Sequence, residues 1–200
     1  LNFANPSAIT SIPSEDLSSY GIGGTSIACK NGIVAATVEG ANYANGKVVF
    51  MDTNGTIGSV VEAGVLPDMI TFSPDGTKVL IANEGQPNSD YTIDPEGTIS
   101  IINVSGGFNN VQQSDVTNLN FNAFDSQLVA LKASGLRVFG VNATVSKDVE
   151  PEYITIADDG LTAWVTLQEN NAVATINLVT NQITAITPLG LKDHNLPGNT

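Results

Sequence analysis

The sequence predicts an all-β protein with the architecture of a β-propeller, of which about three four-stranded blades lie within the 200 residues. From Thr25 onward, short β-rich runs follow one another about every ten residues, each bounded by Gly, Asn, Asp or Pro. The segments PDMITFSPDG and PEYITIADDG, which begin at Pro67 and Pro151, align without a gap. Their starts are about two blade lengths of ~40 to 45 residues apart.

The predicted strands fall into three comparable groups of four. The first group is Thr25–Cys29, Ile33–Val38, Lys47–Met51 and Ile57–Val61. The second group is Met69–Phe72, Lys78–Ala82, Thr98–Val104 and Val111–Val116. The third group is Tyr153–Ala157, Thr162–Leu167, Ala172–Leu178 and Gln182–Thr187. Residues 1–23 form a lead-in segment, and residues 24–200 a partial propeller with blades at about 24–63, 67–117 and 151–190.

Turn chemistry supports this grouping, because the first two strands of every unit are joined by a hairpin signal. The linking sequences are KNG at 30–32, SPDG at 73–76 and ADDG at 157–160. Asn-Gly and Asp-Gly supply the positive φ angles that tight hairpins need. A β-sandwich also accommodates short strands at this spacing, but the in-phase repeat of four-strand units favours the propeller.

Residues 118–147 depart from the two-residue period and are predicted to be an insertion between the second and third blades. Apolar residues recur there at three- to five-residue steps, at Phe121, Phe124, Leu128, Leu131 and Leu136. This spacing predicts a short amphipathic helix over Ala123–Ala133 that ends at Ser134-Gly135. We interpret the insertion as a cap packed on the propeller in preference to a catalytic lid.

The amino-acid composition limits the kinds of partner that the chain is expected to bind. The chain has 20 acidic and 7 basic residues, a net charge of −13, which disfavours nucleic acid and anionic lipid surfaces and favours cations. No apolar run has the length of a membrane span. The single cysteine, Cys29, permits no disulfide within the chain and is expected to be a buried thiol. The acidic, lysine-poor composition suits a secreted or cell-surface protein.

Propeller geometry places many of the acids on one face, where the loops between strands two and three and the inter-blade connections emerge. Glu39, Glu84 and Glu169 end the second strands and are predicted to occupy equivalent positions around one rim. The long loop of the second blade adds Asp90, Asp94 and Glu96, and the inter-blade connections add Glu62, Asp68, Asp148, Glu150 and Glu152. Asp193 follows the third blade within the run Lys192-Asp193-His194.

Carboxylates held close together raise one another's pKa unless a cation neutralises them. Oxygen ligands and the scarcity of His and Cys favour calcium over zinc or copper. The candidate ligands are Glu39, Glu84, Asp90, Asp94, Glu96, Glu150, Glu152, Glu169 and Asp193. The loop around Asp90 lacks the EF-hand spacing, so any site would be composite. The alternative is a solvated acidic face, with some glutamates bonded to loop amides.

Two stretches also resemble a known family. ITFSPDGTKVLIANEGQPNSDYTIDPEGTISIIN and the segment from DVEPEYITIADDG to the end GLKDHNLPGN are similar to the choice-of-anchor I β-propellers, with a match from about Gly24 to Thr200. The resemblance implies an extracellular protein with a closed, about seven-bladed propeller, and an activity of the alkaline phosphatase or phytase kind by analogy of fold. It also implies that this chain is a segment of a longer protein.

Two functions follow as alternatives. The first is a non-catalytic extracellular module whose acidic face binds calcium and, through it, a matrix, a surface polymer or an identical subunit. The second is a metal-dependent phosphoesterase, with Glu84, Glu150, Glu152 and Glu169 as ligands and Lys192 or His194 neutralising the phosphate. A G-x-S-x-G elbow is absent, and the one histidine, His194, is expected to be an exposed loop residue. Trp164 is expected to pack between blades.

Overall fold

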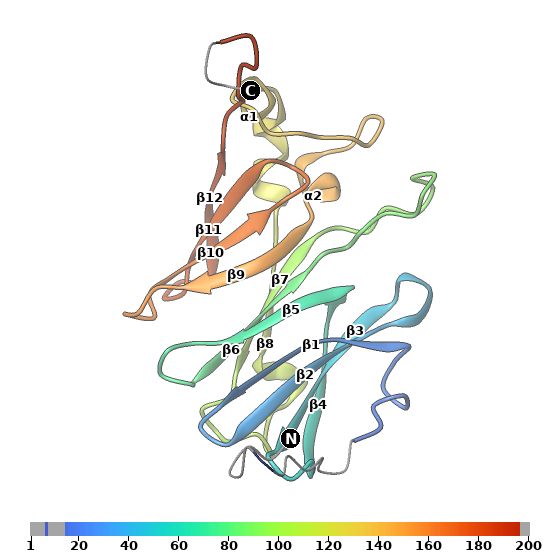
Figure 1. The fold of residues 1–200 in the computed structure, drawn as a ribbon, viewed down its shortest axis with the longest axis vertical. Coiled ribbons are helices and arrows are strands. Elements are labelled where there is room, and N and C mark those ends of the chain that lie inside the picture. The colour runs from blue at the N-terminus through green and yellow to red at the C-terminus, as the bar shows by residue number, and fades with distance from the viewer. Residues whose placement is uncertain (1–6, 8–14, 197–200) are drawn as a thin grey trace.

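The computed structural model describes residue 7 and residues 15–196, and it contains three four-stranded antiparallel sheets (Figure 1). Each sheet is a meander in which every strand pairs with the next one along the chain. The first sheet consists of β1 (Gly23–Lys30), β2 (Ile33–Glu39), β3 (Asn45–Asp52) and β4 (Ile57–Val65). A short 3₁₀ turn, η1 (Ala41–Tyr43), joins β2 to β3. The predicted all-β propeller architecture with three blades is confirmed.

The second and third sheets repeat this plan. The second consists of β5 (Pro67–Phe72), β6 (Lys78–Asn83), β7 (Thr98–Asn103) and β8 (Val116–Asn120), with η2 (Gln113–Asp115) before β8. The third consists of β9 (Pro151–Ile156), β10 (Thr162–Leu167), β11 (Ala172–Asn177) and β12 (Gln182–Pro188).

Hairpin turns behave as their sequences predict. Asn31 and Gly32 both have positive φ angles, 52° and 79°, between β1 and β2. Gly76 and Gly160 have φ angles of 75° and 71° in the corresponding turns of the other two blades. Asp75 Oδ1 accepts hydrogen bonds from the Ser73 hydroxyl at 2.6 Å and from the Thr77 amide at 3.0 Å, which fixes the second turn.

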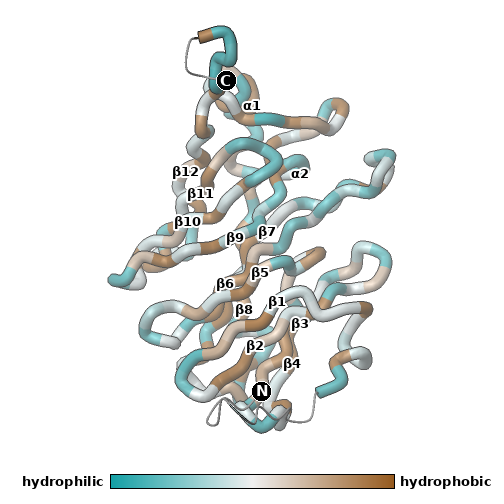
Figure 2. The backbone as a smooth tube through the Cα atoms, in the orientation of Figure 1, coloured by the Kyte–Doolittle hydropathy of each residue, from teal (hydrophilic) through white to brown (hydrophobic). Residues whose placement is uncertain are grey.

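The blades stack face to face, with one apolar layer at each junction (Figures 1 and 2). Along β6 the side chains alternate, so Val79 and Ile81 face the first blade while Leu80 and Ala82 face the third. The three first strands lie next to one another, since β1 contacts β5 and β5 contacts β9. Figure 2 shows the hydrophobic residues along the strands and the hydrophilic ones along the loops.

A glycine and a proline meet at each junction between blades. Gly46 is the second residue of β3, and Gly97 directly precedes β7. Pro67 and Pro151 begin β5 and β9. A Cβ atom on Gly46 would lie 2.4 Å from Pro67 Cδ, and one on Gly97 would lie 2.5 Å from Pro151 Cδ. Only a residue without a side chain permits this approach.

The insertion between the second and third blades packs into the core. It contains η3 (Asn122–Gln127), α1 (Leu128–Ala133) and α2 (Val145–Asp148). Phe121, Phe124, Leu131, Leu136 and Val145 are buried in the layer shared by the second and third blades. The segment predicted as one helix over Ala123–Ala133 is thus a 3₁₀ turn followed by a short α-helix, and it packs on the propeller as the cap interpretation requires.

Three sequence-based expectations are corrected. The fourth strand of the second blade is Val116–Asn120 instead of Val111–Val116, because Asp115 Oδ2 accepts a hydrogen bond from the Gln112 amide and holds the preceding segment in a turn. Cys29 is exposed, since it lies on the outward side of β1. Trp164 is 40% exposed, because it lies on the outer face of the third blade, which no described blade covers. Within residues 15–196 no helix is long and apolar enough to cross a membrane.

Candidate functional site

The loops that carry most of the predicted ligands open on the same side of the molecule (Figure 1). The strand register shows which of the three rim glutamates are equivalent. Glu39 follows Val38, which pairs with Gly24, and Glu84 follows Asn83, which pairs with Pro67. Both pairings lie next to a one-residue bulge, so Glu39 and Glu84 are equivalent. Glu169 lies two residues after Leu167, the partner of Pro151, and is therefore one position beyond equivalence.

Glu84 points from the second blade towards the third, because it continues the side of β6 that carries Leu80 and Ala82. The connection into β9 passes close by. A Cβ atom on Gly97 would lie 2.1 Å from the Val149 carbonyl oxygen and 3.2 Å from the Glu84 carbonyl oxygen. The bare glycine therefore brings Glu150 next to Glu84.

Four glutamates meet at this junction, and we refer to Glu84, Glu150, Glu152 and Glu169 as the carboxyl cluster. The Glu84 and Glu150 side chains influence each other's pKa, and the Glu169 side chain influences the pKa of Glu152. Carboxyl groups interact in this way only at short range. The cluster therefore consists of two interacting carboxyl pairs contributed by two blades.

Burial and mutual repulsion raise the proton affinity of the cluster. Burial raises the pKa of Glu84 to about 7, and the charges of Asp68, Glu150 and Glu169 add to the effect. The pKa of Glu150 is also raised to about 7, first by burial and then by the charges of Glu169 and Asp148. Burial raises the pKa of Glu152 to about 7, and the neighbouring Glu169 carboxylate, as an acceptor for the Glu152 proton and as a charge, raises it further. These three carboxyl groups titrate near neutral pH.

Tyr91 and Asp94 border the cluster from the long β6–β7 loop. Burial raises the pKa of Tyr91, and the charges of Asp148, Glu150 and Asp94 raise it further. Burial also raises the pKa of Asp94, opposed by Lys147, whose Nζ donates to the Asp94 carbonyl at 3.0 Å. Asp94 Oδ1 and Glu169 Oε2 are buried oxygen atoms without a hydrogen-bond partner. Such atoms are ready to accept a ligand.

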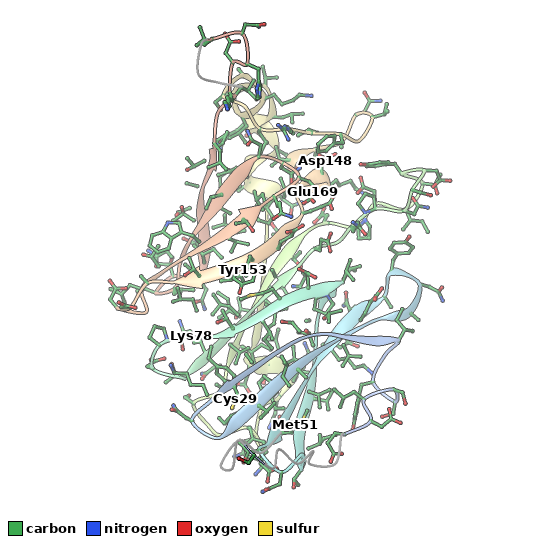
Figure 3. The ribbon with its side chains drawn as sticks, in the orientation of Figure 1. Cys29, Met51, Lys78, Asp148, Tyr153 and Glu169 are labelled. Atoms are coloured by element: carbon green, nitrogen blue, oxygen red, sulfur yellow. The ribbon has the colours of Figure 1, made fainter. Side chains whose placement is uncertain are left out.

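A buried network holds the Glu150 backbone in place. Asn170 is fully buried, accepts a hydrogen bond from the Glu150 amide at 3.0 Å and donates to the Asp148 carbonyl at 2.8 Å. The Asp148 carboxylate accepts from the Phe139 amide at 2.9 Å and from the Gly140 amide at 2.5 Å. Figure 3 shows Asp148 beside Glu169 at the end of the third blade. Sequence analysis identified neither Asn170 nor Tyr91 as part of the site, because both belong to polar loops without a motif.

The remaining predicted ligands lie outside the cluster. Glu39 borders a hollow with Leu66 and Gln86 at the preceding junction. Asp90 is fully exposed, and the Thr92 hydroxyl donates to it at 2.8 Å, which lowers its pKa. Glu96 Oε1 accepts from Asn122 Nδ2 at 3.3 Å, and Asp193 Oδ1 accepts from the Asn195 amide at 2.9 Å.

The donor set of the cluster suits a hard cation, since every ligand atom is an oxygen and Glu169 Oε2 has no partner. The side chains are arranged as pairs. In the part of the chain that the structure describes, no three His, Cys, Asp or Glu side chains converge as a ready-made metal site. A cation at the cluster would therefore bind between pairs and complete its coordination with water or backbone oxygens.

Lys192 and His194 lie elsewhere. Together with Arg137 they line a hollow of about 530 Å³ that also includes Asn171 and Gly190, and no residue of the carboxyl cluster lines it.

Solved structures with the same fold share little sequence with this chain. The crystal structure of a eukaryotic initiation factor matches with a TM-score of 0.53 and 11% sequence identity, over 90% of this chain and 35% of the matched chain. Hydrazine synthase of Kuenenia stuttgartiensis matches with a TM-score of 0.52 and 13% sequence identity, over 82% of this chain and 49% of the matched chain. A functionally unknown protein from Desulfotomaculum acetoxidans DSM 771 matches with a TM-score of 0.53 and 11% sequence identity, over 84% of this chain and 44% of the matched chain. The chain thus spans less than half the length of each.

Sequence comparison gives one further result. The family model described as the choice-of-anchor I domain matches residues 1–200, the whole chain. No curated protein sequence matches it.

Proposed function

Because the chain belongs to the choice-of-anchor I family, we propose that it is a secreted or cell-surface β-propeller module whose carboxyl cluster binds calcium and mediates binding or assembly. The name of the family implies a surface-anchored or secreted protein. At identities of 11% to 13%, the matched structures support the propeller fold and carry no argument about function.

The observation that supports calcium most strongly is the pairing of the four glutamates. Two blades place two carboxyl pairs at one junction, and within each pair the neighbouring carboxyl group contributes to a raised pKa. The −13 charge of the chain opposes such clustering. Carboxyl groups that bind a cation together are expected to have raised pKa values when the cation is absent, because protons then neutralise their charges.

Calcium suits this arrangement better than magnesium. Ca²⁺ tolerates six to eight oxygen ligands in irregular geometry, whereas Mg²⁺ requires a near-ideal octahedron. Carboxylates from two blades, together with water molecules, would provide the irregular oxygen coordination that Ca²⁺ tolerates. Coordination positions left open to solvent would let the bound ion bridge to an anionic matrix, a surface polymer or an identical subunit.

Calorimetric titration with calcium tests the proposal. We expect saturable binding at pH 7.5, with proton release that appears as different heats in buffers of different ionisation enthalpy. Glu150→Gln and Glu152→Gln should each weaken binding at least about tenfold, since each removes a charged ligand. The control, Glu62→Gln, changes an exposed glutamate of β4. No binding at millimolar calcium, or equal effects of all three substitutions, would refute the calcium site.

One observation favours the second candidate, a metal-dependent phosphoesterase. Carboxyl groups with pKa values of about 7 can accept and donate protons at neutral pH, as general acid–base catalysis requires. Against it, Lys192 and His194 lie in a hollow that no cluster residue lines, so the expected phosphate-neutralising charges do not come with the cluster. Chelator-sensitive hydrolysis of an aryl phosphate, lost in Glu169→Gln, would establish the enzyme. Calcium binding without turnover would exclude it.

A further inference from the structure

Positive charge gathers in one hollow of this acidic chain. Arg137, Lys192 and His194 line it, so two of the seven basic residues and the one histidine of the sequence are brought together. Arg137 comes from the insertion between blades, and the other two residues follow β12. All three side chains are exposed, so solvent-borne ligands can reach them.

Two adjacent asparagines fix the walls of this hollow. The Arg137 amide donates to the Asn170 carbonyl at 2.9 Å, and Asn170 Nδ2 donates to the Arg137 carbonyl at 3.1 Å. Because Asn170 is fully buried, the backbone of Arg137 is held on both sides by a rigid partner.

The opposite wall depends on Asn171. Its Nδ2 donates to the Gly135 carbonyl at 3.1 Å and to the Gly190 carbonyl at 2.7 Å, and its own carbonyl accepts from the Leu189 amide at 2.9 Å. Gly135 and Gly190 are in contact, since a Cβ atom on Gly135 would lie 3.2 Å from Gly190 Cα. The segment that carries Lys192 and His194 is therefore anchored two residues before Lys192.

We propose that this hollow is a binding site for a phosphate group, with Arg137 as the bidentate donor and Lys192 and His194 as supporting donors. A guanidinium presents a planar pair of N–H groups that matches two oxygens of a tetrahedral anion, and an ammonium adds a point charge. The nearest acid in sequence, Asp193, is absent from the lining, and its Oδ1 accepts from the Asn195 amide.

The surrounding charge makes such a site selective. The chain carries −13 overall, so an anion is repelled from most of the surface and retained only where basic groups converge. A phosphate there is either a free ion or one group of a phosphorylated polymer. The proposal is independent of calcium, because the carboxyl cluster does not line the hollow.

The test is titration of the whole 200-residue protein with inorganic phosphate and, separately, with polyphosphate, both in EDTA at low ionic strength. We expect saturation at millimolar phosphate or below, and amide NMR shifts at Asn171 and Gly190, which lie in the wall. Polyphosphate should bind more tightly per molecule if the natural ligand is a polymer, and no more tightly per phosphate group if it is the free ion.

Arg137→Gln and Lys192→Gln should each weaken phosphate binding about tenfold while leaving the melting temperature unchanged, since both side chains are exposed. Lys132→Gln is the matched control, because Lys132 is an exposed basic residue of α1 outside the hollow. The proposal fails if neither ligand saturates, or if Lys132→Gln weakens binding as much as Arg137→Gln. Since calcium is absent throughout, this outcome leaves the calcium proposal untouched.

Discussion

At the residue scale, what distinguishes the carboxyl cluster is a set of substitutions within the repeat. Glu150 and Glu169 stand at the positions that Leu66 and Gly85 occupy one junction earlier. Glu39 is equivalent to Glu84, yet it meets Leu66 instead of a second carboxyl group. The first junction therefore has acids at two of the four positions, Glu39 and Asp68, whereas the second has acids at all four, although their backbones are built alike.

This arrangement predicts that stability without calcium falls as pH rises. Burial holds the pKa values of Glu84, Glu150 and Glu152 at about 7, against 4.5 for an ordinary glutamate. The folded state therefore binds more protons than the unfolded chain between about pH 4.5 and 7, and the unfolding free energy decreases through that window and levels off above it.

The Glu150→Gln protein should show a flatter dependence, because an amide does not titrate. It should be more stable than the parent by about 1 kcal/mol at pH 8 in EDTA, a figure reduced for solvent screening of a cluster open on one side. Thermal unfolding between pH 5 and 8 measures this, with Glu62→Gln as the control. A parent protein that gains stability from pH 5 to 8 would contradict the prediction.

Propeller geometry applied to the sequence placed some of the expected ligands side by side. Glu84, Glu150, Glu152 and Glu169 are four of the nine, and they lie at one junction, while metal binding by them stays a prediction. Asp90 and Glu96 do not, because Thr92 and Asn122 bind their carboxylates locally. Alignment of the two junctions would have separated Glu150 and Glu169 from the rest, whereas nothing in the local sequence marks Asn170 as the buried partner of Glu150.

At the element scale, the contact between Gly97 and Pro151 decides whether the two carboxyl pairs can form. The start of β7 lies directly against the connection that carries Glu150. A side chain at this position would separate the second blade from the third. The glycine is thus needed for the geometry of the site as well as for the packing of the two blades.

Gly97→Ala should therefore destabilise the protein and impair the site together. The added Cβ would lie 2.1 Å from the Val149 carbonyl oxygen, a contact that forces the backbone apart at a cost of about 1–3 kcal/mol. Denaturant unfolding and calcium titration measure the two effects. Gly106→Ala is the matched control, because a Cβ atom there meets nothing within 4 Å. Equal stability of the Gly97→Ala and Gly106→Ala proteins would contradict the prediction, since it would show that the two blades accommodate the added methyl group without strain.

Strands in which apolar and polar residues alternate clearly were easier to predict from the sequence than strands that are mostly polar. The strands bordered by Asn-Gly or Asp-Gly turns were placed to within two residues at the turn. The last strand of the second blade was missed because VTNLN is mostly polar and Leu119 is its one buried residue, whereas Val111 belongs to the core without being in a strand.

At the scale of the whole molecule, the two outer blades have uncovered faces. Tyr153 and Trp164 are 66% and 40% exposed on the third blade, and Ile27 is 68% exposed on the first. Met69 and Leu80 stand at the positions of Tyr153 and Trp164 in the second blade, and there they pack against the third. The third blade therefore presents the side by which a blade normally contacts its neighbour.

The 200-residue chain is accordingly expected to self-associate at roughly micromolar to millimolar concentrations, because exposed apolar sheet faces are association sites. Sedimentation velocity measures association, and the single tryptophan should shift its emission to shorter wavelength as Trp164 becomes covered. The double variant Tyr153→Thr, Trp164→Thr should stay monomeric. Val141→Thr, at a residue 92% exposed in the insertion, should behave like the parent. A monomeric parent would show that the face is stable in water.

The glycine and proline contacts also bear on how such a chain could grow. Gly46 contacts Pro67 in the same way as Gly97 contacts Pro151. A duplicated segment that contains both residues would therefore also contain the contact by which it packs against its neighbour. In the third blade the position of Gly97 is taken by Asn171, which has a φ angle of 55° and binds the insertion and the segment after β12. Asn171 thus stands where the other two blades have glycine, and it lines the charged hollow.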